Sequence, residues 1–306
     1  MKYLHILSLL LIINACNGQQ KQKEEQTAQP HTFEMVTVPA MITDPAERAD
    51  YLAKHYWDKF NFKDTTYLHE PEITEQALSN FIGIMGYASP EAISPSIKTL
   101  MQKAETDSTM FRYFSDQMEK YLYDPNSPLR NEEMYIPVLE YLTESSSLAD
   151  VDKIRPAHLL ELALKNRIGA PAADFTYTLA NGQTGKLSGL KADYLLIFFN
   201  NPDCHACQEI TQQLSTSPLI GTLEKSKRLK ILAVYPDEDL QAWKNHQASM
   251  PAHWINAYDK SLTLKNDEVY DLKAIPTLYL VNKEKKVILK DATFKDLEDY
   301  LSQIPN

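Results

Sequence analysis

Two closely spaced cysteines, Cys204 and Cys207, constrain the fold of this chain more than any other feature. They follow Tyr194–Phe199, a continuous apolar run that is typical of a buried central strand. Ile210 and Leu214 then continue at helical spacing, so the cysteines are expected to open a helix. A Cys-x-x-Cys motif between a buried strand and a helix start is a specific arrangement and predicts redox chemistry.

The helix start assigns different roles to the two cysteines. Its free backbone N–H groups and the positive end of its dipole favour a thiolate on the first sulfur. Cys204 is therefore the predicted nucleophile, and Cys207 is the thiol that resolves the mixed disulfide. His205, as a cation, would favour the thiolate further and tune the redox potential, whereas Asp203 opposes it. The alternative for His205 is a solvent-exposed spacer.

Other uses of the two cysteines fit the sequence less well. A structural zinc site needs about four ligands, and the chain has no second cysteine pair. His55, His69 and His158 stand singly, so we expect neither a metal nor a cofactor. A purely structural disulfide over so short a loop would contribute only about 2 kcal/mol. A copper-chaperone variant of the motif has one more intervening residue.

The first residues form a separate signal. Lys2 precedes Leu4–Ile13, an apolar run too short to span a bilayer of about 30 Å. Ile13-Asn14-Ala15-Cys16 resembles a bacterial lipobox, in which the cysteine is diacylated. We therefore expect residues 1–15 to be a signal peptide and Cys16 to carry a lipid anchor to the membrane. The alternative is an ordinary signal peptide in which Cys16 is incidental.

Export would place the protein in the cell envelope as a periplasm-facing lipoprotein, where disulfides can persist. Residues 16–32 are rich in Gln, Lys and Glu and are predicted to be a flexible tether. A Gln-Lys-Glu-Glu stretch within them, residues 22–25, leaves export to the cell surface open. The formal net charge of -10 argues against a nucleic-acid partner, because phosphate binding requires a basic surface.

The remaining chain divides where the hydrophobic period changes. Residues 33–166 carry aromatic and Met stripes at helical spacing, which indicate an all-α domain with a packed core. This region shows no converging polar cluster, so we expect no chemistry in it. Residues 167–306 alternate between strands and helices and predict an α/β domain. The expected strands are Phe175–Leu179 and Lys186–Leu187 around an Asn-Gly turn, Tyr194–Phe199, Leu229–Tyr235, Thr277–Val281 and Val287–Leu289.

Both halves resemble known families. Ala46-Glu-Arg48, Tyr56-Trp57 and Tyr135-Ile-Pro-Val-Leu139 resemble a helical domain of unknown function that commonly precedes thioredoxin-like domains in lipoproteins of anaerobic gut bacteria. The second half resembles the TlpA/ResA-like branch of the thioredoxin superfamily, through Arg167-Ile-Gly169, Ala173-Asp174-Phe175, Phe198-Phe199 before the Cys-x-x-Cys motif, and Ala274-Ile275-Pro276-Thr277. This second resemblance covers residues 167–306. It implies a thioredoxin-like fold in which Pro276 is a cis-proline facing the cysteines.

The sequence departs from that branch at two places and from thioredoxin itself at a third. Asp203 stands where the family usually has Trp, and Phe198 stands where thioredoxin itself has an acidic residue. The branch often has a Glu three residues after the second cysteine, but here Ile210 occupies that position and Glu209 comes one residue early. One residue turns a helical side chain by about 100°, so the role of that Glu is not carried over to Glu209.

These observations predict an enzyme, a protein thiol–disulfide oxidoreductase that reduces extracytoplasmic clients through Cys204 and Cys207. Its partners would be proteins with disulfides or dithiols and an upstream electron donor. One alternative is a thiol peroxidase, although Asn200-Asn201-Pro202-Asp203 before the cysteine lacks the peroxiredoxin pattern. Another is a lipoprotein adaptor that uses the fold as a binding scaffold.

Overall fold

The computed structural model describes residues 32–305. The chain divides into two units, Met1–Thr32 and Phe33–Asn306, and almost everything described belongs to the second. The predicted signal peptide and Cys16 lie outside the described residues, as does the predicted tether apart from Thr32. The lipid anchor therefore stays a prediction.

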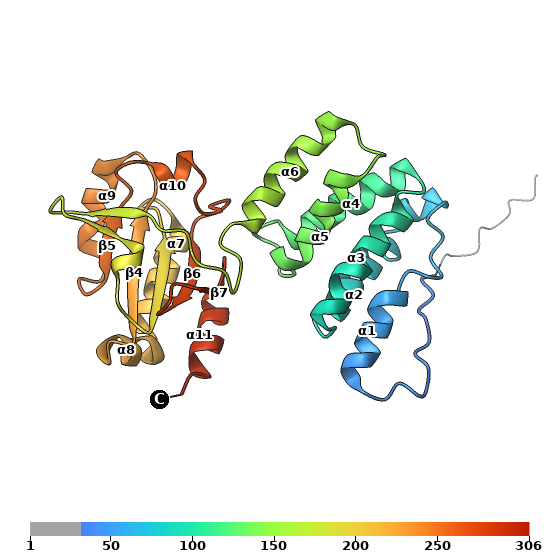
Figure 1. Cartoon of the computed structure of the whole chain (residues 1–306), viewed down its shortest axis with the longest axis horizontal. Helices are drawn as coiled ribbons and strands as arrows, with labels where there is room; N and C mark the ends of the chain where they lie inside the picture. The colour runs from blue at the N-terminus through green and yellow to red at the C-terminus, as the bar shows by residue number, and fades with distance from the viewer. Residues whose placement is uncertain (1–31, 306) are drawn as a thin grey trace, which may run out of the picture. The chain divides into compact units, whose positions relative to one another are not determined.

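The first part of the second unit is helical, as predicted (Figure 1). Asp44, Asp107 and Asn131 each accept backbone N–H groups at the start of a helix, which fixes where these helices begin. Trp57 is 3% exposed and lies at the centre of an aromatic core with Phe114, as the aromatic stripes predict. The elements are α1 (Pro45–His55), η1 (Thr65–His69), α2 (Thr74–Met85), α3 (Pro90–Ala104), α4 (Ser108–Leu122), α5 (Glu132–Glu144) and α6 (Asp150–Leu164).

The second part is a mixed seven-stranded sheet with helices, which confirms the predicted α/β class. Its strand order is β2-β1-β5-β4-β3-β6-β7. Strand β3 pairs parallel with β4 and antiparallel with β6, so it is central. The strands are β1 (Thr176–Leu179), β2 (Thr184–Lys186), β3 (Tyr194–Phe199), β4 (Leu229–Tyr235), β5 (Ile255–Tyr258), β6 (Thr277–Asn282) and β7 (Val287–Leu289). The helices are η2 (Leu187–Gly189), α7 (His205–Thr216), α8 (Pro218–Lys225), α9 (Leu240–His246), η3 (Gln247–Ser249), α10 (Thr263–Asn266) and α11 (Phe294–Ser302).

Strand β3 is apolar along its length because it is covered on both faces. Leu196 and Phe198 point into one core, which contains residues of α7, α8 and α11. Leu195, Ile197 and Phe199 point into the other core, which contains residues of β1, α10 and the segment after it. This double burial holds the C-terminal end of β3 at Phe199 in place, and α7 begins shortly after it at His205.

Candidate active site

Cys204 and Cys207 form a disulfide at the start of α7, with their Cα atoms 5.2 Å apart. Cys204 is the N-cap residue, and its Sγ accepts the backbone N–H of Cys207 at 3.1 Å. Cys207 is 3% exposed and lies in the same apolar core as Phe198. After reduction, the N–H donor and the helix dipole would stabilise a thiolate on Cys204.

The loop before β6 covers the disulfide from the other side. The Ile275–Pro276 peptide bond is cis, as the family resemblance implies for Pro276. The carbonyl oxygen of Ile275 lies 3.5 Å from the Sγ of Cys204. The topology brings these residues together, because β3 and β6 are neighbours and Phe199 is opposite Thr277. The three site residues that the sequence predicts for the redox chemistry, Cys204, Cys207 and Pro276, are thus in one place.

The charged residues near the cysteines point outward. The side chain of His205 is 86% exposed, and its Nε2 lies 3.9 Å from Oε1 of Glu209. Asp203 is also exposed. Glu209 lies on the surface of α7 rather than beside Cys207, as expected from its one-residue displacement. This carboxylate neighbour would offset a positive charge on the ring of His205. The tuning role of His205 stays a prediction, since the described residues show no hydrogen bond or ion pair between its ring and a cysteine.

The burial of the two sulfurs leads to a prediction for the reduced protein. Iodoacetamide should label Cys204 at least about tenfold faster than Cys207, because Cys204 is half-buried at a helix start and Cys207 is enclosed. Timed quenching followed by peptide mass spectrometry measures both rates. The variant Cys207→Ser should keep the fast rate. Faster labelling of Cys207 would reverse the assigned roles.

We call residues 273–276, the loop that precedes β6, the redox loop. A hollow of about 390 Å³ begins beside it. Ile275 and Pro236 line it from the α/β part, and His158 and Leu159 line it from α6. The Nε2 of His158 lies 3.5 Å from Oε1 of Glu268 across this hollow. The helical part therefore supplies one wall of a space that Ile275 also lines.

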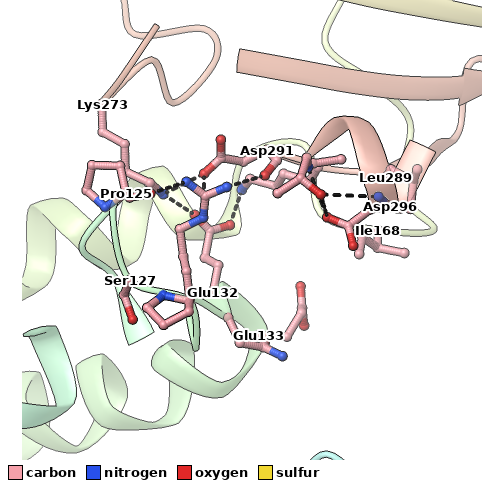
Figure 2. A pocket seen from close by; sticks show the side chains of 15 residues that line it. Pro125, Ser127, Glu132, Glu133, Ile168, Lys273, Leu289, Asp291 and Asp296 are labelled. Atoms are coloured by element: carbon pink, nitrogen blue, oxygen red, sulfur yellow. Dashed lines mark hydrogen bonds and ion pairs between the residues drawn. The ribbon is translucent and has the colours of Figure 1, made fainter. Parts of the chain in front are cut away.

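A second hollow, of about 570 Å³, lies where the helical and α/β parts meet (Figure 2). Charged side chains from both parts converge here, among them Glu132, Lys273 and Lys290. The expectation that the helical region has no converging polar cluster is therefore wrong. These residues are far apart in the sequence, and nothing local distinguishes them from solvated surface charges.

Two kinds of feature are absent from the part of the chain that the structure describes. Within residues 32–305, no three His, Cys, Asp or Glu side chains lie close enough to hold a metal ion. In the same range, no helix is both long and apolar enough to cross a membrane.

The fold and the cysteine pair define a protein of the thioredoxin class, and comparisons with known proteins agree. A family model described as thioredoxin-like matches residues 192–287, and the domain of unknown function DUF5106 matches residues 15–166. A thioredoxin-like protein from Bacteroides caccae is 50% identical and has a TM-score of 0.87. That alignment covers 90% of this chain and 99% of the other. The chain therefore belongs to the thioredoxin-like proteins, with a DUF5106 region ahead of its thioredoxin-like domain.

Other relatives match a smaller share of the chain. The C-terminal domain of an uncharacterized protein from Bacteroides fragilis is 50% identical, with a TM-score of 0.45, over 45% of this chain and 99% of that one. Nucleoredoxin from Bos taurus is 23% identical over 120 residues, which are 39% of this chain and 27% of that protein. Human nucleoredoxin gives 24% over 119 residues, again 39% and 27%. The chain thus spans about a quarter of the length of these curated relatives.

Proposed function

We propose that this protein is a thiol–disulfide oxidoreductase that reduces disulfides of client proteins through Cys204 and Cys207. The observation that carries the proposal is the position of Cys204. Its sulfur caps α7 and lies between the Cys207 N–H and the Ile275 carbonyl, and the residue is half-buried. A buried second sulfur within bonding distance completes a dithiol that can open and close.

The reaction takes two exchange steps. The Cys204 thiolate attacks one sulfur of a client disulfide, forms a mixed disulfide and releases the other client sulfur as a thiolate. Cys207 then loses its proton to solvent and attacks the Sγ of Cys204, which releases the second client thiolate. Two electrons have passed to the client, and the Cys204–Cys207 disulfide remains. An upstream dithiol donor must reduce this disulfide before the next cycle.

Two features support the reducing direction. The TlpA/ResA-like resemblance implies it, and two exposed carboxylates stand close to the nucleophile in the sequence. Asp203 precedes Cys204, and Glu209 follows one turn later beside His205. Negative charges raise the free energy of a nearby thiolate, which favours the disulfide form and makes the dithiol a better electron donor.

The client is proposed to lie along the loop at Ile275. The carbonyl oxygen of Ile275 lies 3.5 Å from the sulfur of Cys204, and Ile275 also lines the hollow of Pro236 and His158. An extended client segment placed along this path would bring its disulfide to Cys204.

Insulin reduction with dithiothreitol as electron donor tests the proposed activity. The wild-type protein should accelerate precipitation of the insulin B chain well beyond dithiothreitol alone. The double variant Cys204→Ser/Cys207→Ser should give only the background rate. A wild-type rate equal to that of the double variant would reject the proposal.

The cellular place is proposed from the sequence of the first residues. Acylation of Cys16 would tether the protein to the cell envelope, where its clients would be exported proteins. A clickable fatty-acid probe in the producing cells should label the wild type and not Cys16→Ala, and only the wild type should sediment with membranes. An unlabelled, non-sedimenting wild type would remove this part of the proposal.

A further inference from the structure

Lys273 connects the redox loop to the helical part of the molecule. Its side chain is 10% exposed, and its Nζ lies 3.1 Å from Asp271 Oδ2 and 3.5 Å from Asp291 Oδ2. Two groups of the helical part also reach it. The Oε2 of Glu132, at the start of α5, lies 3.4 Å away, and the ring of Tyr123, after α4, lies 4.6 Å below. A largely desolvated ammonium is thus held from both parts at once.

We call the charge cluster of Glu132, Lys273 and Lys290 the junction, because it connects the helical and α/β parts. Glu132 contacts both lysines (Figure 2). Its other oxygen, Oε1, lies 2.5 Å from the Nζ of Lys290, which is 4% exposed. Lys290 in turn donates to the carbonyls of Ala163 at 2.9 Å and Lys165 at 2.6 Å, at the C-terminal end of α6. Burial raises the pKa of Glu132, and the two lysines oppose that rise. One carboxylate therefore bridges two buried lysines of the α/β part.

The segment from Lys273 to the redox site is short and is held by hydrogen bonds at both ends. Only Ala274 lies between Lys273 and Ile275. Asp271 Oδ1 accepts the backbone N–H of Lys273 at 3.1 Å, and the hydroxyl of Thr277 donates to the carbonyl of Ala274. A displacement of Lys273 would therefore be passed on to the Ile275 carbonyl, 3.5 Å from the Sγ of Cys204.

We propose that Glu132 is a positioning residue for the redox site: through Lys273 it holds the Ile275 carbonyl against Cys204. The helical part thereby shapes the loop along which a client lies. This inference rests on the proposed function, which it deepens. It also explains why a carboxylate from the helical part is buried against two lysines of the other part, since a surface ion pair would leave the loop free.

The variant Glu132→Gln tests this role, with Glu133→Gln as its matched control. Both variants remove one negative charge from the first turn of α5, so their long-range electrostatic effects are similar. Glu133 pairs with Arg167, and no contact of Glu133 reaches the loop within the described structure. Circular dichroism of each variant establishes that it is folded before the redox measurements.

Two measurements should change in opposite directions in Glu132→Gln. Reduced Cys204 should react about fivefold faster with iodoacetamide, because the Ile275 carbonyl, whose oxygen lies 3.5 Å from the Sγ, no longer covers that sulfur. Insulin reduction should slow about tenfold, because a displaced loop no longer aligns the client disulfide. Glu133→Gln should match the wild type in both. General destabilisation alone would not accelerate the one and slow the other.

Glu132→Gln values equal to those of Glu133→Gln would overturn the positioning role. If Glu132→Gln does not fold, Lys273→Met breaks the same link from the loop side while it keeps most of the buried stem, and the same two results are expected of it. A wild type that does not reduce insulin would reject the proposed function. The alkylation rates would then decide the positioning role by themselves.

Discussion

Replacing Cys207 by serine is expected to stop the protein at the mixed disulfide, so that covalent adducts with clients accumulate. The reason is that the two cysteines have different roles. Cys204, at the N-cap position, attacks the client disulfide, and Cys207, which is 3% exposed, resolves the mixed disulfide. Turnover with insulin should fall at least about a thousandfold, as it does when one member of a catalytic unit is removed. Non-reducing gels of the variant, expressed in its own cells, should show adducts that dithiothreitol dissolves.

The variant Cys204→Ser is the matched control for trapping. It also has a single remaining thiol, but that thiol is enclosed in the core with Phe198 and has no helix-cap donor. It should lose turnover to the same extent and trap few proteins or none. Equal trapping by the two variants would contradict the proposed order of attack and resolution. Mass spectrometry of the adducts from Cys207→Ser would name the clients.

Replacing Lys290 by alanine is expected to give the largest loss of stability outside the apolar cores. The side chain is 4% exposed, lies 2.5 Å from Glu132 and satisfies carbonyls at the end of α6. Its removal leaves a buried carboxylate with a single, longer contact to Lys273 and leaves the helix end uncapped. Breaking one partner of a buried pair costs about 3–5 kcal/mol, which urea unfolding followed by circular dichroism measures.

Lys295→Ala serves as the comparison for that loss. Lys295 also pairs with a carboxylate, Asp299, but its side chain is 80% exposed on α11. Its removal should leave the urea midpoint unchanged, because solvent screens exposed pairs. If Lys290→Ala unfolds at the same urea midpoint as Lys295→Ala, the contacts of Lys290 with the helical part contribute nothing to the free energy of unfolding.

The parts of the fold that sequence predicts well are those with strong local patterns. Tyr194–Phe199 is apolar throughout because both of its faces are covered, and Cys204 stands where a helix must begin. Strand β5, Ile255–Tyr258, had no such signal. It contains Asn256 and Ala257, and it is a strand because it pairs with both β4 and β1. That pairing depends on long-range topology, which a local period does not encode.

The junction was not predicted for the same reason. Lys273 and Glu132 are separated by 141 positions, and each resembles an ordinary exposed charge in its local sequence. Only the folded chain shows that both side chains are largely buried and that Glu132 also pairs with Lys290. The expectation that the helical region carries no chemistry stays untested. Under our proposal, this region supports the redox loop through Glu132.

The central claim is that the Cys204–Cys207 pair is a working redox couple, and its reduction potential tests this most directly. Oxidised protein is equilibrated with dithiothreitol or glutathione buffers of graded potential, alkylated and weighed by mass spectrometry. A redox-active pair should open in one two-electron transition between about −120 and −270 mV, near the more negative limit for a reductant. A pair that stays closed until below about −300 mV would be a structural disulfide, and the account would be contradicted.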